Sequence, residues 1–200
     1  MQPASTKILI LSDIHYPLTN KNELLEIINR ERPDKVIFLG DTIQKTVDIH
    51  DLDRLIETTT CHDFSFIAGD EDPPLLSTES LDLTLSGRKF LFIHGFQFNL
   101  SSEDNTRKLA KTLRKIHKNL PVLGYSLISK IRSRSFRTYL ILGHSHALKF
   151  FPRLKVACAG CLTTEGNLYN DRGYLVLEEI GEGVTIFVKG LGVVPLVYEI

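Results

Sequence analysis

Hydrophobic residues in the first 70 positions follow two alternating patterns. Continuous hydrophobic runs that end in polar residues span 7–13, 34–41 and 64–70, and each predicts a strand buried on both faces. Segments 20–33 and 48–60 carry hydrophobic residues three or four positions apart, which predicts amphipathic helices. Buried strands separated by such helices indicate β-α-β units on a parallel sheet.

The remainder of the chain is predicted to be mostly strand. Residues 81–95 favour a hairpin that turns at Ser86 and Gly87, and a helical, basic insertion is expected at about 101–137. Further strands are expected over 138–146, 154–160, 173–190 (turning at Gly181 to Gly183) and 193–200. We find no internal repeat or linker, so we expect a single α/β domain over residues 1–200, with two packed sheets flanked by helices.

The composition is that of an ordinary soluble protein, with 42% hydrophobic and 24% charged residues. The 24 basic and 24 acidic residues balance, so the net charge does not point to nucleic acid or membrane. No hydrophobic run reaches the roughly 18 residues of a membrane span, and the first residues lack the features of a signal peptide. We therefore expect a cytoplasmic protein.

The three cysteines, Cys61, Cys158 and Cys161, argue against a disulfide framework because their number is odd and no secretory signal accompanies them. Cys158 and Cys161 form one CxxC pair, whereas a structural zinc site needs two further ligands. We expect small buried thiols, with a redox or zinc role as the alternative.

Acidic and histidine residues recur where the predicted strands end. Carboxyl ends of strands are where ligand sites form in open α/β sheets, so these side chains are expected to converge. Carboxylate and imidazole together are suited to divalent metal, and seven such groups are enough for two ions. The residues are Asp13, His15, Asp41, Asp70, His94, His144 and His146. His50, His62 and His117 lie in polar segments and are expected to be solvated.

These strand ends resemble the motifs of the calcineurin-like metallophosphoesterase family, whose pattern is DxH, GD, GNH(D/E), H and GHxH. The corresponding blocks are DIH at 13–15, GD at 40–41, GDED at 69–72, HG at 94–95 and GHSH at 143–146. The resemblance implies a four-layer α/β/β/α sandwich of two mixed sheets between helices.

The resemblance also implies a dinuclear site. Asp13, His15, Asp41 and His146 would hold one divalent ion, and Asp41, Asp70, His94 and His144 the other, so that Asp41 bridges. Mn²⁺ is the expected metal, with Fe, Zn, Ni or Mg as alternatives. A hydroxide between the metals would attack a phosphodiester or pyrophosphate bond. Asp41, His144 and Glu71 would then be the residues at the reacting phosphate.

Two positions depart from the family pattern. Asp70 replaces the usual Asn, which adds a negative charge to the site but keeps a ligand. Glu71 replaces a histidine thought to steady the phosphate or protonate the leaving group. An ionised Glu71 would repel phosphate, and Glu71 could act as an acid only if desolvation raised its pKa. The alternative function is therefore a metal-binding scaffold of the same fold with little catalysis.

The insertion carries ten basic residues and no acidic ones between positions 107 and 137. Three interpretations remain open: a helical cap whose apolar face packs on the body, a lid for an anionic substrate larger than a nucleotide, or a surface for nucleic acid or lipid headgroups. A nuclease is a third functional option, supported only by this segment. The basic residues are Arg107, Lys108, Lys111, Arg114, Lys115, Lys118, Lys130, Arg132, Arg134 and Arg137.

Overall fold

The computed structural model describes residues 5–44, 50, 54, 56–73, 78–98, 103–163, 169 and 171–200. Its first half contains β1 (Thr6–Leu11), α1 (Lys21–Glu31), β2 (Lys35–Leu39), β3 (Phe64–Ile67), β4 (Ser80–Leu85), β5 (Arg88–Ile93) and the 3-10 turn η1 (Phe96–Phe98). Its second half contains α3 (Glu103–Ile116), α4 (Leu120–Arg132), β6 (Tyr139–Leu142), β7 (Leu148–Phe151), η2 (Pro152–Leu154), β8 (Val156–Ala159), β9 (Gly173–Ile180), β10 (Gly183–Gly190) and β11 (Leu196–Glu199).

The strands form two mixed sheets. The six-stranded sheet has the order β11-β10-β9-β1-β2-β3, with β1, β2 and β3 parallel and β9, β10 and β11 antiparallel to their neighbours. The five-stranded sheet has the order β4-β5-β6-β8-β7, in which β5, β6 and β8 are parallel. The predicted β-α-β arrangement of the first 70 residues is thus confirmed for its strands.

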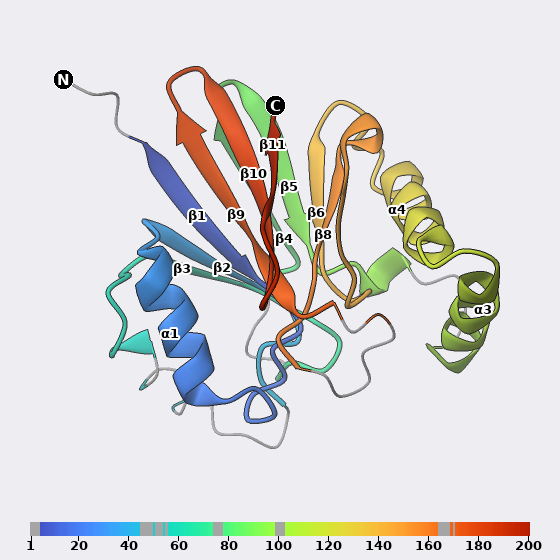
Figure 1. Cartoon of the computed structure of the whole chain (residues 1–200), viewed down its shortest axis with the longest axis horizontal. Helices are drawn as coiled ribbons and strands as arrows, with labels where there is room; N and C mark the ends of the chain where they lie inside the picture. Colours follow the sequence, from blue (N-terminus) through green and yellow to red (C-terminus); the bar gives the residue numbers. More distant parts are fainter. Residues whose placement is uncertain are drawn as a thin grey trace.

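Alternate side chains of β1 enter two different cores, which explains its continuous hydrophobic run. Ile8 and Ile10 lie in the core between the two sheets, whereas Leu9 and Leu11 pack toward α1. A third core, which includes Val122 of α4, covers the outer face of the five-stranded sheet. Figure 1 shows the resulting four layers, with α1 on one side of the sheets and α4 on the other. The predicted sandwich of two sheets between helices is confirmed.

Local signals at both ends of α1 account for its limits. The Asn20 side chain caps the helix by accepting a hydrogen bond from the Asn22 N–H at 2.8 Å. The helix ends where Arg32 adopts a left-handed conformation (φ 45°) and donates its N–H to the Ile28 carbonyl at 2.9 Å. These caps fix where α1 delivers its hydrophobic face to the sheet.

Several predicted elements match closely, and one strand of the structure was not predicted. The hairpin at 81–95 forms as β4 and β5, and the pair β9 and β10 turns where expected. Strand β7 was not predicted: it is only four residues long, pairs with β8 alone and has a mixed pattern, so its sequence carries a weak strand signal. The helix predicted over 48–60 lies largely outside the described residues.

The three cysteines form no disulfide with one another and are buried, as expected for small thiols. Cys161 donates its S–H to the Thr163 carbonyl at 3.1 Å, and the Cys158 sulfur lies 3.7 Å from the Ser126 hydroxyl. These contacts place the CxxC residues in the packed interior.

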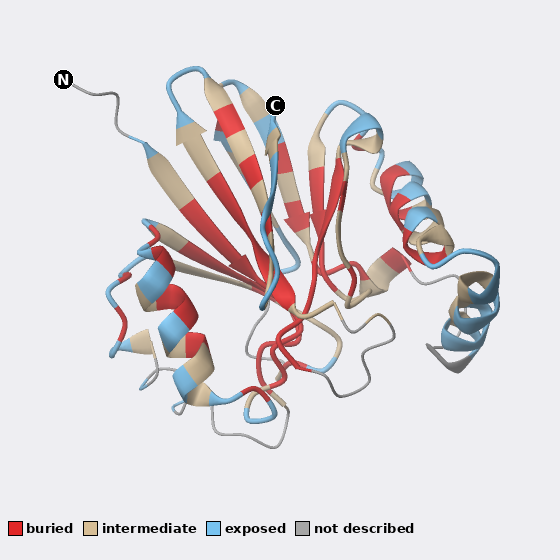
Figure 2. Ribbon diagram, in the orientation of Figure 1, coloured by how far each residue is buried: buried red, intermediate tan, exposed pale blue. Residues whose placement is uncertain are grey.

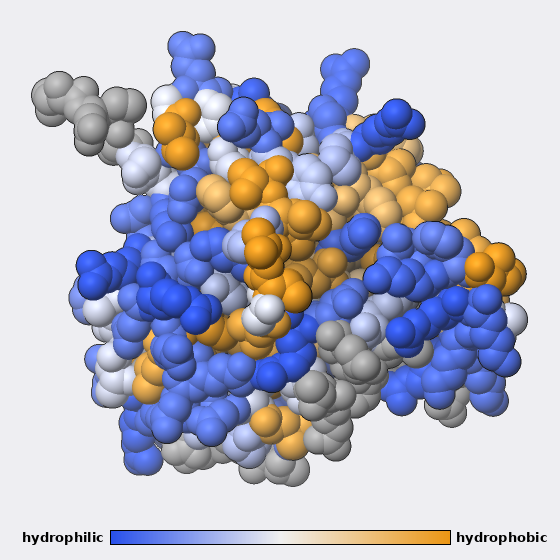
Figure 3. Space-filling model, in the orientation of Figure 1, coloured by the Kyte–Doolittle hydropathy of each residue, from blue (hydrophilic) through white to orange (hydrophobic). Residues whose placement is uncertain are grey.

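Exposed hydrophobic side chains gather on two parts of the surface. The edge strand β11 and the turn before it expose Val193, Val194, Leu196 and Val197, visible as a hydrophobic strip along the middle of Figure 3. The second part is α4, where Tyr125 packs on the body but Leu123 and Leu127 are exposed. No helix among the described residues is long and apolar enough to cross a membrane.

Glu31 links the end of α1 to the six-stranded sheet through a buried network. Its carboxylate lies 3.0 Å from the Lys7 ammonium and 2.7 Å from the Lys189 ammonium, and accepts a hydrogen bond from the Tyr174 hydroxyl at 2.6 Å. Burial alone would raise the pKa of Glu31, but these partners hold it below its ordinary value of 4.5. The ionised carboxylate therefore stabilises the fold above about pH 4.5, and this stabilisation is lost as the pH falls.

Replacing Glu31 with Gln is expected to lower the free energy of unfolding by about 1–3 kcal/mol at pH 7, because the buried carboxylate loses its charged contacts with Lys7 and Lys189. Urea unfolding measures the loss, which should shrink as the pH is lowered below about 4.5. Glu26→Gln is the matched control. The Glu26 side chain is 76% exposed, and its ion pair with Arg30 is long at 3.9 Å, so this substitution should change stability by less than about 0.5 kcal/mol. Equal losses in the two variants would contradict this account of Glu31.

Candidate metal centre

The candidate site lies where strands of both sheets end. Asp13 and His15 follow β1, Asp41 follows β2, and Asp70 follows β3. The other sheet contributes His94 after β5, and His144 and His146 after β6. Figure 2 shows the buried positions continuing from the strands into these loops. All seven residues predicted from the strand ends are therefore brought to one region of the molecule.

The loops at the site have an unusual backbone conformation. Nine non-glycine residues in the described part of the chain have positive φ, and five of them are Asp13, His15, Asp41, His144 and His146. Non-glycine residues adopt this region at a cost, and such residues cluster at functional sites. Hydrogen bonds between loops hold the conformation, including Asp13 N–H to the Gly40 carbonyl at 3.1 Å and His15 N–H to the Asp41 carbonyl at 2.8 Å.

Two glycines allow the loops to approach each other this closely. A Cβ on Gly40, which has φ 81°, would lie 2.2 Å from Nδ1 of His94. A Cβ on Gly69 would lie 2.2 Å from Oδ1 of Asp41. The glycine that precedes each aspartate in the GD and GDED blocks is therefore required by packing around the site.

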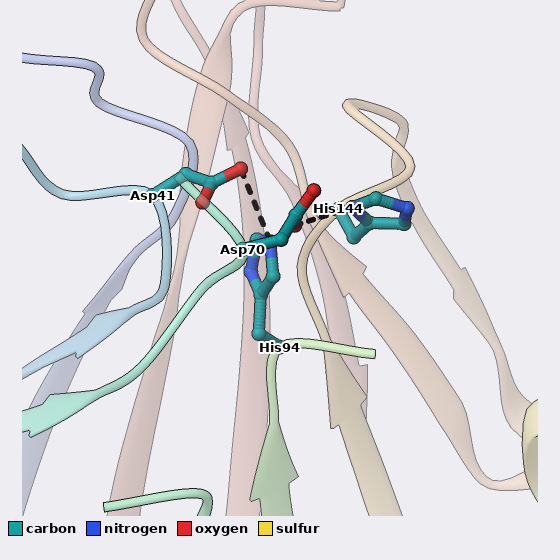
Figure 4. A group of neighbouring side chains, drawn as sticks. All are labelled: Asp41, Asp70, His94 and His144. Carbon is teal, nitrogen blue, oxygen red and sulfur yellow. Dashed lines mark ion pairs between the residues drawn. The ribbon is translucent and has the colours of Figure 1, made fainter. Parts of the chain in front are cut away.

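One group of candidate ligands contains Asp41, Asp70, His94 and His144, whose nearest ligand atoms all lie within 4.8 Å of one another. Nε2 of His94 is 3.3 Å from an Asp41 oxygen and 3.4 Å from an Asp70 oxygen. Nδ1 of His144 is 3.3 Å from the same Asp70 oxygen. Figure 4 shows the two aspartates and His94 directed toward a common centre, with His144 beside Asp70.

The second group contains Asp13, His15 and His146, which satisfy the same 4.8 Å criterion. Nε2 of His146 lies 3.1 Å from Oδ1 of Asp13, and the His15 and His146 ring centroids are 5.6 Å apart. Asp13 also connects the groups, because its Oδ2 accepts a hydrogen bond from the His144 N–H at 3.1 Å. The two groups are thus adjoining parts of one site.

Neighbouring groups select which nitrogen of two histidines faces the site. Nδ1 of His94 lies 2.8 Å from the Leu39 carbonyl, which can only accept a hydrogen, so this nitrogen carries the proton. Nδ1 of His15 similarly lies 3.1 Å from the Glu71 carboxylate. In both residues Nε2 is the nitrogen left to face the site. It is buried, and in His94 it lies 3.3 Å from Asp41 and 3.4 Å from Asp70. Histidines that bind metal are commonly oriented in this way.

The charges in the site favour positive charge beside the aspartates. Burial would lower the pKa of His94, but Asp41 and Asp70 raise it well above its usual value. Burial likewise opposes protonation of His146, whose pKa Asp13 nevertheless raises to about 10. Oδ1 of Asp13 is buried, and Nε2 of His146 lies 3.1 Å from it. A divalent cation would fit these buried carboxylates and imidazole nitrogens, because it would supply the positive charge that protons otherwise provide.

Asp72 and Ser12 support the site and were not among the predicted site residues. The buried Asp72 carboxylate accepts hydrogen bonds from the N–H groups of Thr42, Ile43 and Gly69 at 2.7, 3.0 and 2.8 Å, and so joins the loops after β2 and β3. The Ser12 hydroxyl lies 2.5 Å from Oδ2 of Asp13. The fourth position of the GDED block is the sequence signal that could have identified Asp72.

Glu71 stands at the edge of the site. Its N–H donates to Oδ1 of Asp41 at 2.8 Å, and its carboxylate pairs with His15. The Glu71 side chain is 54% exposed. It is therefore not in the desolvated surroundings that the general-acid hypothesis requires. The histidines predicted to be solvated, His50, His62 and His117, are all exposed.

Comparison with known proteins identifies the family. The calcineurin-like phosphoesterase superfamily domain matches residues 6–178, so the chain belongs to this family. No curated protein sequence matches the chain. The family and the donor set together indicate binding of divalent metal.

Solved structures with the same fold share little sequence identity with the chain. Wild-type Vps29 complexed with Zn²⁺ from Entamoeba histolytica is 18% identical, with 98% of each chain covered and a TM-score of 0.61. A predicted phosphoesterase from Streptococcus pneumoniae is 14% identical, with 99% of each chain covered and a TM-score of 0.58. YfcE, a phosphoesterase from E. coli, is 15% identical, with 96% of this chain and 98% of that chain covered and a TM-score of 0.51. At these identities the likeness establishes the fold alone.

Divalent metal is expected to stabilise the protein against heat, because it binds the folded ligand groups. At a concentration one hundred times the Kd, binding adds about 2.7 kcal/mol, which corresponds to a rise in Tm of roughly 5–10 °C for a chain of this size. His94→Gln should largely abolish the rise measured by calorimetry with Mn²⁺ or Zn²⁺. The control His62→Gln changes an exposed histidine and should retain it. A full rise in His94→Gln would contradict the ligand assignment.

Proposed function

We propose that this protein is a dinuclear metal-dependent phosphoesterase that hydrolyses phosphodiester or pyrophosphate bonds. The observation that carries the proposal is the pair of adjoining ligand groups at the strand ends, which includes every one of the seven positions of the family pattern. A scaffold under no pressure to bind metal would be expected to lose some of these residues. The only change among them, Asp70, keeps an oxygen ligand.

The proposed division of ligands follows the two groups. Asp13, His15 and His146 would hold one cation, and Asp41, Asp70, His94 and His144 the other. From the family pattern we propose that Asp41 is shared by both cations. Mixed carboxylate and imidazole ligation suits Mn²⁺, with Fe, Zn, Ni or Mg as alternatives. Two bound cations would supply Lewis acidity, making a water molecule nucleophilic and neutralising phosphate oxygens during in-line attack.

The protein's own residues would hold this centre rigid and shape access to it. Asp72 and the Glu71 N–H fix the Asp41 loop and carboxylate, so the shared ligand stays in place while the site is used. His144 is the more accessible histidine of its group, with 15% of its side chain exposed against 0% for His94. We therefore place the reacting phosphate on the side of His144.

Glu71 is proposed to position His15. By accepting the Nδ1 proton at 3.1 Å, its carboxylate would keep Nε2 of His15 directed at the cation. This role uses the charge of Glu71 and does not need a protonated carboxyl. It also leaves the enzyme without the family's histidine at position 71, so substrates with good leaving groups should react best.

A metal-binding scaffold with little catalysis is the second candidate function. The observation that favours it is the exposed negative charge of Glu71 beside the ligands, which would repel a phosphate dianion. A phosphodiester carries one charge fewer than a monoester dianion and is repelled less. The diesterase proposal and the scaffold proposal therefore differ in turnover of an activated diester.

Hydrolysis of bis-nitrophenyl phosphate is expected to require added divalent metal, with Mn²⁺ among the most effective ions. Asp41→Asn should reduce the rate by roughly a thousandfold or more, since it removes charge from the ligand shared by both cations. Rates and bound metal would be measured together on dialysed protein. Undiminished turnover in excess chelator would exclude the metal mechanism, and absence of turnover with two metals bound would favour the scaffold.

The role of Glu71 can be separated from general-acid catalysis by two substitutions. Glu71→Ala should weaken one of the two metal sites about 10- to 100-fold in calorimetric titration, because His15 loses its orienting partner. Glu71→Gln should be milder, since the amide oxygen can still accept the Nδ1 proton. A general acid would give the opposite pattern, in which Gln and Ala reduce the rate equally at saturating metal while metal affinity is unchanged.

A further inference from the structure

The outward face of α4 is hydrophobic while its inward face is partly polar, the reverse of an ordinary surface helix. Leu123, Leu127 and Ile131 are 39%, 47% and 54% exposed. Their spacing of four residues places them in one line along the helix. We call these three residues the α4 stripe. Figure 2 shows exposed positions on the side of α4 that faces away from the sheet.

Contacts on the inward face hold α4 in this rotation. Ser126 and Ser129 are completely buried, and Lys130 is only 4% exposed. The Lys130 ammonium donates hydrogen bonds to the carbonyls of Thr138 and Lys155. Burial, together with the nearby charge of Lys155, lowers the pKa of Lys130 to about 8. Turning the helix to bury the α4 stripe would break these bonds, so the exposed stripe is part of the fold.

Basic residues are concentrated in the same segment as the α4 stripe. Of the ten between positions 107 and 137, Lys130 points inward, and most of the others are exposed. Outside residues 107–137 the chain has 14 basic and 24 acidic residues, so the rest of the molecule has a formal charge of −10. Figure 3 shows hydrophilic side chains over α3 and hydrophobic ones over part of α4. Two further hydrophobic side chains in this region, Ile116 and Phe136, are 74% and 63% exposed.

We infer that α3 and α4 form a docking surface for an anionic lipid membrane, with the α4 stripe inserted among the acyl chains at the interface and the cations on the headgroups. Aliphatic side chains on one face of a helix flanked by Lys and Arg are the features of helices that lie in a membrane interface. Juxtaposed cations add attraction to anionic headgroups that falls off with ionic strength. This inference is independent of the proposed hydrolytic activity.

Other occupants fit the observations less well. Single-stranded nucleic acid is bound by aromatic side chains on which bases stack, whereas the α4 stripe is aliphatic. A second copy would bring the same basic surface against this one, and like charges would repel. The exposed hydrophobic strip at β11 is bordered by both signs of charge, with Arg30, Glu31 and Lys189 beside Val193 and Val194, and Glu199 at the end of the strand. It therefore lacks the concentration of cations that an anionic membrane would attract.

Vesicle flotation with the full chain tests the inference. The protein is expected to bind vesicles of mixed phosphatidylglycerol and phosphatidylcholine but not vesicles of phosphatidylcholine alone. Because salt screens the attraction between cations and headgroups, binding should weaken at least about tenfold between roughly 50 and 300 mM NaCl. The triple variant Leu123→Gln, Leu127→Gln, Ile131→Gln should lose about tenfold or more in affinity. The control Leu196→Thr, Val197→Thr removes exposed hydrophobic residues of β11 and should bind like the wild type.

A tryptophan reporter checks the same point without depending on the triple variant. The chain has no tryptophan, so Leu127→Trp introduces a single fluorophore on the α4 stripe. Its emission should shift to shorter wavelength with anionic vesicles and be quenched by brominated acyl chains. Val197→Trp, on β11, should show neither effect.

Three results would overturn the inference. They are failure of the wild type to bind anionic vesicles, binding by the triple variant equal to that of the wild type, and equal responses of the two tryptophan reporters. Tighter binding to a single-stranded oligonucleotide than to vesicles, unaffected by the triple variant, would instead assign the surface to nucleic acid. Association of the wild type into dimers that the triple variant abolishes would assign it to a second copy.

Discussion

The architecture depends on neutralising three aspartates at the place where the two sheets end. Asp13, Asp41 and Asp70 are brought together by three adjacent parallel strands, and two of them are almost completely buried. Such a cluster is unfavourable unless positive charge accompanies it. The second sheet supplies His94, His144 and His146, whose nitrogens lie within 3.1 to 3.4 Å of the aspartates. Protons can balance this charge in part, and divalent cations match the donor set better.

The loops around the aspartates are held by backbone conformation, close packing and hydrogen bonds between loops. Left-handed backbone occurs at five of the candidate ligands, and glycine at 40 and 69 makes room for the side chains of His94 and Asp41. Asp72 then ties two of the loops together through three N–H groups. The two packed sheets provide the fixed frame from which these loops extend, so the site is held by the fold and not by the loops alone.

The strands and the site residues could be predicted from the sequence because both follow from the burial of the strands on both faces. Strands buried on both faces need continuous hydrophobic runs, and the polar residue that ends each run is a candidate ligand. The contact between His15 and Glu71 could not be predicted in the same way, since it joins loops far apart in the sequence. The outward direction of the α4 stripe could not be predicted either, because it depends on the hydrogen bonds that Lys130 donates to the carbonyls of Thr138 and Lys155. Strand β7 carried too weak a pattern to be recognised.

Anomalous diffraction from crystals grown with Mn²⁺ tests the central claim most directly. The account predicts two separate manganese peaks, one bonded to Asp13, His15 and His146 and the other to Asp70, His94 and His144, with Asp41 contacting both. A single peak, or none at saturating metal, would contradict the dinuclear centre.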